Sequence, residues 1–186
     1  MDEAAAVARA RDGDSEAFRV LVDRHSRALF RLAFRMTGNA HDAEDVVQEA
    51  FLKAYRGLDG FDERSQFGSW LYRIAANCAF DVLRARQRRD GRLESMDEGD
   101  WADPPAPEPG PDRLALGEDV RRRVDAALSR MSPRERAAFV LRHFEGRSIR
   151  EIGDALELDS EAVKQSVCRA VRKARRVLAP FAGMVS

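Results

Sequence analysis

The sequence is poor in the residues from which metal centres, disulfide frameworks and catalytic sites are built. It has two cysteines, Cys78 and Cys168, which lie too far apart to suggest a metal pair and which both fall in helical patterns. The three histidines (His25, His41 and His143) are scattered, no nucleophile–base set is evident, and no glycine-rich phosphate loop is present. We therefore expect buried thiols in a reducing compartment, no cofactor, no metal and no catalytic activity.

Long apolar runs and alternating apolar patterns are also missing. The first ten residues, MDEAAAVARA, begin with acids and contain no apolar core, unlike a signal peptide. No stretch approaches the ~20 apolar residues that a membrane span needs. No segment shows the period-two alternation that is typical of a half-buried strand. These absences predict an all-α protein that is soluble and cytoplasmic, with no membrane insertion.

The formal net charge of zero conceals an uneven distribution of charge and proline. Residues 90–112 contain eight acids against the single cation Arg92, and they hold five of the seven prolines. Such a composition is typical of an extended or disordered tether. The remainder of the chain is correspondingly basic. We therefore expect two small helical domains, residues 1–89 and 113–186, joined by a flexible, acidic, proline-rich linker over residues 90–112.

Helical periodicity recurs throughout the first of these domains. Apolar residues spaced three and four apart predict helices over residues 15–24, 26–37, 41–56 and 66–86. The last of these helices keeps a long apolar stripe and ends in a run of arginines. Four such helices would pack as a bundle around one core that is rich in aromatic side chains.

The second domain begins with two further predicted helices, over residues 113–129 and from Ser132 to Gly146. The start of the later helix is marked by Ser-Pro-Arg-Glu, which combines an N-cap serine, a proline at the first position and a glutamate at the third. With the two helices that follow, this domain has four helices in about 75 residues, which is small but can fold alone.

The end of the chain has the pattern of a helix-turn-helix. Ser148 and Glu151 form a capping box ahead of a short helix, and either Asp159 or Ser160 can cap the helix that follows the turn. That final helix carries six cations and one acid before Val177. A short helix, a turn and a basic helix are typical of the motif that places its second helix in a DNA major groove. The residues therefore predict DNA binding.

Three segments resemble conserved regions of bacterial RNA polymerase sigma factors of the sigma-70 family. DAEDVVQEAFLKAY (42–55) and SQFGSWLYRIAANCAFDVLR (65–84) are similar to regions 2.2 to 2.4, and the segment 131–175 is similar to region 4. Because the chain lacks an extra middle domain, it resembles the compact extracytoplasmic-function (ECF) group. The resemblance implies a region 2 bundle and a region 4 helix-turn-helix in a subunit that binds core polymerase. Such a subunit directs promoter-specific initiation by recognising −35 and −10 elements and aiding strand opening.

The resemblance gives the residues of the first domain expected roles. In the family, the region 2.2 helix docks on the clamp coiled coil of the largest polymerase subunit. The residues that would supply this face are Glu44, Asp45, Gln48 and Glu49.

The loop 61–69 would form a pocket for a base of the melted strand, while arginines hold nearby phosphates. The expected −10 contacts are Phe61, Ser65, Gln66, Phe67, Tyr72, Arg73, Asn77, Arg84 and Arg88. Trp70 lies on the apolar stripe and is expected to be structural.

In region 4, the resemblance implies that the basic helix reads the −35 element as duplex DNA. The expected contacts are Ser148, Arg150, Lys164, Gln165, Ser166, Arg169, Arg172 and Lys173. Two positions depart from the family pattern. Ser166 stands where many relatives carry an arginine, and a serine cannot make the bidentate guanine contact that an arginine makes. Glu157 stands where the turn usually has a glycine, which implies a left-handed or altered turn.

The resemblance also implies partners beyond promoter DNA and the clamp. These are the polymerase beta flap and an anti-sigma factor that wedges between the two domains. The alternative is a stand-alone dimeric helix-turn-helix regulator that binds a palindromic duplex site without polymerase. That alternative leaves the matches over 42–55 and 61–77 unexplained.

Overall fold

The structure, a computed structural model, describes residues 2–62, 66–90 and 115–178. The elements are α1 (Glu3–Arg11), α2 (Ser15–Thr37), α3 (Ala40–Gly57), a 3-10 turn (Leu58–Gly60), α4 (Phe67–Arg89), α5 (Ala115–Ser129), α6 (Pro133–Phe139), a π-helical turn (Val140–Phe144), α7 (Ile149–Leu156) and α8 (Ser160–Leu178). These described residues contain no strand, which confirms the prediction of an all-α fold. None of their helices is long and apolar enough to cross a membrane.

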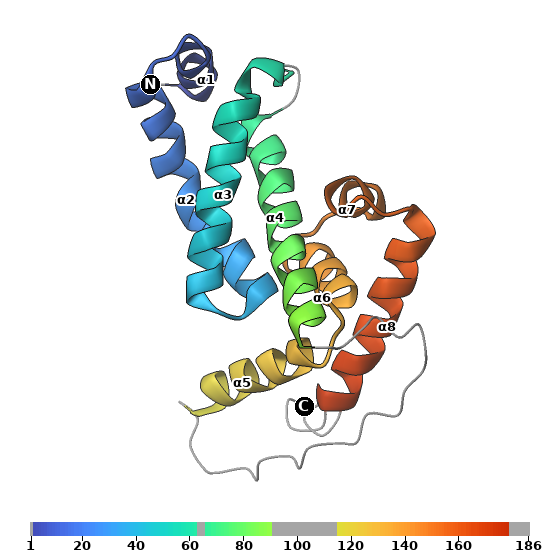
Figure 1. The fold of residues 1–186 in the computed structure, drawn as a ribbon. Helices are drawn as coiled ribbons and strands as arrows, with labels where there is room; N and C mark the ends of the chain where they lie inside the picture. Colours follow the sequence, from blue (N-terminus) through green and yellow to red (C-terminus); the bar gives the residue numbers. More distant parts are fainter. Residues whose placement is uncertain (1, 63–65, 91–114, 179–186) are drawn as a thin grey trace.

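The first lobe consists of α1 to α4, with α2, α3 and α4 running side by side (Figure 1). Two helices were predicted over residues 15–37, but α2 is continuous, because the polar run from Arg24 to Arg27 interrupts the apolar stripe without containing a helix breaker. The helix ends at Gly38, which adopts a left-handed conformation (φ 71°). Helix α1 was not predicted at all. It buries three small residues, Ala6, Val7 and Ala10, which give a weak amphipathic signal.

The second lobe consists of α5 to α8. The helix expected from Ser132 to Gly146 is α-helical only as far as Phe139, and a π-helical turn follows. The amide of Arg147 closes this region by donating to the carbonyl of Leu141 at 2.9 Å. The π-turn therefore separates α6 from the helix-turn-helix of α7 and α8.

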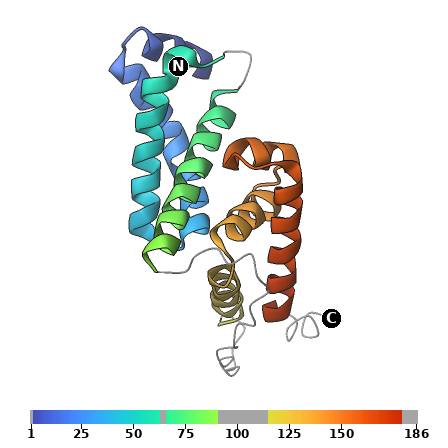
Figure 2. The ribbon, with the colours of Figure 1, turned by 45° about the vertical axis from the view of Figure 1, so that its right-hand side comes forward.

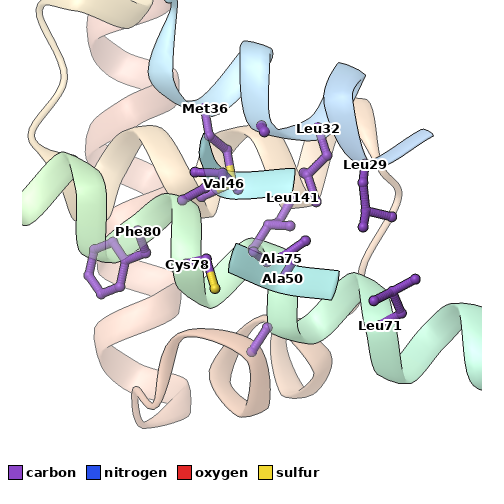
Figure 3. Close-up of a cluster of buried hydrophobic side chains, with 14 of the residues drawn as sticks. Leu29, Leu32, Met36, Val46, Ala50, Leu71, Ala75, Cys78, Phe80 and Leu141 are labelled. Carbon is purple, nitrogen blue, oxygen red and sulfur yellow. The ribbon is translucent and has the colours of Figure 1, made fainter. Parts of the chain in front are cut away.

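The two lobes pack directly against each other, with α6 and α7 in contact with α4 (Figure 2). Leu141 of the π-turn is fully buried in one continuous apolar cluster with Leu32, Met36 and Ala75 of the first lobe (Figure 3). The domain boundaries at residues 89 and 113 stay a prediction, and nearly all of the expected linker lies outside the described residues.

Candidate polymerase and nucleic-acid interfaces

The four residues predicted to bind polymerase lie together on the exposed face of α3. Helix α3 begins after Asn39, whose side chain accepts a hydrogen bond from the amide of Asp42 at 3.0 Å. Its other face buries an alanine- and valine-rich stripe against α2 and α4. This packing turns the four predicted polymerase-binding side chains outward, namely Glu44, Asp45, Gln48 and Glu49.

Three of these four residues line a groove between α3 and α4. Asp45, Gln48 and Glu49 share the groove with residues that the sequence reasoning missed, among them Leu52, Tyr55 and Asp81; the acids of the lining outnumber its one cation, Lys53. Leu52 and Tyr55, three residues apart on α3, are 43% and 47% exposed. Leu52 stands three residues after Glu49, so helical spacing could have placed it on the acidic face. The groove therefore combines negative charge with accessible apolar surface.

An aromatic cluster lies where the family resemblance places the base pocket. The ring of Phe61 is 5.0 Å from that of Trp70 and 5.7 Å from that of Phe67, centroid to centroid. Phe61 and Phe67 are both buried, so they form the floor of this region, and Trp70 is partly buried against them as expected of a structural residue. Gln66 is exposed beside them, whereas Ser65 lies outside the described residues.

Residues of helices α1 and α2 contact this cluster, and the sequence analysis did not predict these contacts. The guanidinium of Arg11 donates to the carbonyl of Phe61 at 3.0 Å. His25 lies 2.6 Å from a carboxylate oxygen of Glu3, and its ring is 5.6 Å from that of Phe67. A Cβ on Gly68 would lie 3.1 Å from the same histidine ring. Side chains of α1 and α2 thus fix both ends of the 61–67 segment.

Two predicted −10 residues face the second lobe. The guanidinium of Arg147 lies 4.4 Å above the ring of Tyr72, and the amide of Asn77 donates to Glu157 at 3.5 Å. Burial, together with the negative charge of Glu145, raises the pKa of Tyr72, so that its phenol stays protonated. Arg73, by contrast, is exposed.

The end of α4 carries the predicted phosphate contacts. Arg84 and Arg88 are both exposed, and the guanidinium of Arg84 lies 5.6 Å from the ring centroid of Phe80. Their neighbour Arg86 is instead held against the first lobe, with 2.9 Å to Asp42 and 3.2 Å to the carbonyl of Thr37. Arg89 is exposed as well, so Arg84, Arg88 and Arg89 are the side chains of this run that are placed to meet a phosphate backbone.

The helix-turn-helix has the geometry that its sequence predicted. Ser148 and Glu151 form the capping box of α7, which lowers the pKa of Glu151 through hydrogen bonds from Ser148. Asp159 caps α8 by accepting from the amide of Ala162 at 2.7 Å, which resolves the choice between Asp159 and Ser160. A Cβ on Gly153 would lie 2.7 Å from the carbonyl of Leu158, so the close approach in the turn requires glycine there.

Most of the predicted −35 residues have exposed side chains, and two have side chains that are bonded within the second lobe. The exposed members are Ser148, Arg150, Lys164, Gln165, Arg169 and Arg172. Ser166 is buried at 5% exposure, and its hydroxyl donates to the carbonyl of Ala162 at 2.6 Å. Lys173 is bonded to the buried Glu135 at 2.7 Å. These placements argue against a direct base contact by Ser166 and give Lys173 a role inside the second lobe.

Comparisons with known proteins agree with this arrangement. The family models Sigma-70 region 2 and Sigma-70, region 4 match residues 21–89 and 121–173. The ECF RNA polymerase sigma factor SigW of Bacillus subtilis is 32% identical, over 89% of this chain and 91% of that protein. SigE of Mycolicibacterium smegmatis is 36% identical over 86% of this chain, which spans 60% of that protein's length.

A solved structure shows the same likeness in three dimensions. The structure of CnrH in complex with the cytosolic domain of CnrY matches with a TM-score of 0.61 and 29% sequence identity, over 97% of this chain and 99% of that chain. The chain therefore belongs to the ECF group of the sigma-70 family of RNA polymerase sigma factors.

Proposed function

We propose that this chain binds core RNA polymerase in the cytoplasm and directs initiation at promoters that carry a −35 and a −10 element. The observation that carries the proposal is that one chain presents two surfaces, one suited to polymerase and, later in the sequence, one suited to DNA. An acidic groove lies on the region 2 bundle, and an exposed basic helix lies on the region 4 helix-turn-helix. In this proposal the polymerase performs the chemistry, and the chain contributes binding and strand capture.

The groove between α3 and α4 is the proposed docking site for the clamp coiled coil. Asp45, Gln48 and Glu49 would orient a basic helix of the polymerase, because complementary charge speeds encounter and fixes register. Leu52 and Tyr55 would supply the apolar contact that gives an interface most of its affinity. Glu44 lies outside the groove lining and would act through its charge at the rim.

Promoter contacts follow from the exposed residues of α4 and α8. Gln66 adjoins Phe67 of the aromatic cluster, and the exposed Arg73 follows Trp70 by three residues on α4. Both would contact the melted strand there, while Arg84 and Arg88 would hold its phosphates. Lys164, Gln165, Arg169 and Arg172 would contact the −35 duplex, with Ser148 and Arg150 at the adjacent backbone. The second lobe would also engage the polymerase beta flap.

A protein partner that restrains the chain also belongs to the proposal. CnrH was solved in complex with the cytosolic domain of CnrY. We propose that this chain also has a protein partner, an anti-sigma factor that holds it away from polymerase. Because the two lobes contact each other directly here, a partner that wedges between them would first displace contacts such as that between Arg35 and Glu145.

Charge reversal on α3 tests the proposed polymerase interface. We expect Asp45→Lys and Glu49→Lys each to weaken binding to bacterial core polymerase roughly ten-fold, as measured by titration of labelled chain, because each places a cation against a basic surface. Glu16→Lys is the matched control, since Glu16 is exposed on α2 and does not line the groove. Equal affinity of all three variants would refute the docking role.

The alternative function, a stand-alone dimeric regulator, makes the opposite prediction. It requires a dimer on a palindromic duplex and no affinity for core polymerase. The match of residues 21–89 to Sigma-70 region 2 disfavours it, because a duplex-binding regulator has no need of that bundle.

A further inference from the structure

A buried carboxylate joins the last helix of the second lobe to the start of α6. The ammonium of Lys173, on α8, donates to the carboxylate of Glu135 at 2.7 Å and to the carbonyl of Arg130 at 3.4 Å. The side chains of Glu135 and Lys173 are 9% and 35% exposed. The pair joins residues that are 38 positions apart in the chain, so it ties α8 to the turn between α5 and α6.

The carboxylate of Glu135 has a second partner. Its Oε2 atom, which accepts from Lys173, also accepts from the amide of Ser132 at 2.9 Å. The hydroxyl of Ser132 accepts in turn from the amide of Glu135 at 3.3 Å, which completes the capping box of α6. Because the capping box orients the carboxylate, it also determines where the ammonium of Lys173 must lie.

Stability alone does not account for an ion pair at this place. Taking a carboxylate and an ammonium out of water costs free energy that their attraction often fails to repay, and an apolar pair of similar size is commonly as stable. Most other buried residues of the two helices are small and apolar, namely Ala137, Ala138, Ala170 and Ala174. Alanines interlock weakly across a helix pair, so a directional contact is what fixes the register and rotation of one helix on the other.

The rotation of α8 decides where its outward side chains point. Lys173 and the buried Ser166 are seven residues apart, so they lie on one side of the helix, while Arg169 and Arg172 are exposed. A rotation of about 20° would move a group at a radius of 5–6 Å by about 2 Å. Hydrogen-bond distances vary over only about 0.5 Å, so such a rotation would break contacts to base edges.

We propose that Glu135 and Lys173 are positioning residues, which fix the rotation of α8 and thereby set how strongly its exposed face discriminates between −35 sequences. The proposal rests on the proposed function of α8, and neither side chain touches DNA in it. A phosphate contact by Lys173 would have different consequences. It would add affinity for every sequence and steepen the salt dependence, whereas a positioning residue changes the ratio of affinities between sequences.

The test uses the full-length chain and two duplexes, one that the wild-type chain enriches from a random pool and a scrambled duplex of the same composition. The main variant combines Glu135→Gln with Lys173→Met, which leaves no buried charge and keeps an oxygen for the amide of Ser132. We expect a urea midpoint close to that of the wild-type chain and a ratio of affinities for the two duplexes that falls roughly five-fold or more. The slope of log affinity against log salt should stay unchanged.

Two single variants sharpen the comparison. Lys164→Met alters an exposed lysine of the same helix and should weaken both duplexes together, with a salt slope lowered by about one. Glu135→Gln keeps an acceptor for both Ser132 and Lys173, so it should retain most of the ratio.

Three results with the double variant would overturn the proposal. An unchanged ratio would show that the pair does not position α8 for reading. A salt slope lowered by about one would make Lys173 a phosphate contact, and loss of the fold would assign the pair to stability. A wild-type chain that enriches no duplex at all would refute the proposed function as well, because α8 would then read no DNA.

Discussion

At the scale of single residues, burial decides which chemical groups are available. Cys78 is buried and Cys168 is exposed, although both fall on helical patterns in the sequence. Burial raises the pKa of the Cys78 thiol, against the opposing positive charge of Lys53. The prediction of two buried thiols is therefore correct for Cys78 and wrong for Cys168, which points away from the stripe of α8.

The two thiols should differ in reactivity. A raised pKa leaves less thiolate at any given pH, so Cys78 should stay unreactive at pH 8 while Cys168 is modified. We expect one thiol per native chain to react quickly with a chromogenic disulfide reagent and two to react in denaturant. The variant Cys168→Ser is the control and should show almost no fast reaction in the native state. Rapid loss of two thiols from the native wild-type chain would contradict the burial of Cys78.

The cap of α8 offers a matched pair of neighbouring residues. Asp159 accepts a hydrogen bond from the first turn of the helix, whereas Ser160 is the first helical residue. Asp159→Ala should lower the free energy of unfolding by about 1 kcal/mol, and Ser160→Ala should change it by less than about 0.5 kcal/mol. Urea denaturation checks both values, and the reverse order would show that Ser160 provides the cap.

At the scale of elements, periodicity predicts helices well where the buried stripe is broad and apolar. It identified α3, α4 and the helix-turn-helix, because residues such as Val46, Leu71 and Ile152 recur at helical spacing. It missed α1, whose buried face is made of alanine and valine. It divided α2 at Arg24 to Arg27, where the polar residues lie inside an unbroken helix. Helix ends marked by capping boxes were the most predictable, since their signals are local.

Helix α1 should affect −10 recognition without touching DNA. Removing the Arg11 hydrogen bond to the carbonyl of Phe61 would loosen one end of the segment that carries the aromatic cluster. We expect Arg11→Ala to reduce promoter opening roughly three- to ten-fold, as measured by permanganate reactivity of the melted strand, while core binding is unchanged. Arg19→Ala on the exposed face of α2 is the control. Equal loss of core binding in Arg11→Ala would indicate general unfolding of the first lobe instead.

Helix α8 provides a comparison between a side chain that faces out and one that faces in. Arg169→Ala should weaken discrimination of the −35 sequence by about 1–3 kcal/mol, because a base or phosphate contact is lost. Ser166→Ala should leave binding within about two-fold, since the Ser166 hydroxyl is bonded within its own helix. Competition binding with duplex −35 fragments checks both. A large loss in Ser166→Ala alone would contradict the orientation of α8 seen here.

At the scale of the whole molecule, the sequence predicted the two lobes but not how they pack. The contacts of Arg35 with Glu145 and of Arg147 with Tyr72 join residues far apart in the chain, and no local pattern announces them. For the same reason, the sequence predicted that Tyr72 and Asn77 would be available to contact DNA, whereas in the structure both contact the second lobe. The acids of the groove on α3 could be predicted from the sequence. Leu52 and Tyr55 could not, because only the structure shows that these two residues are exposed.

The most direct test of the central claim is transcription by reconstituted polymerase. Core enzyme from a bacterium is incubated with this chain and genomic DNA, and the 5′ ends of the run-off transcripts are sequenced. We predict start sites that are absent without the chain, that share one −35 and one −10 sequence, and that are lost with Asp45→Lys. A chain that binds duplex DNA yet yields no new start sites with core polymerase would contradict its assignment as a promoter-specificity subunit.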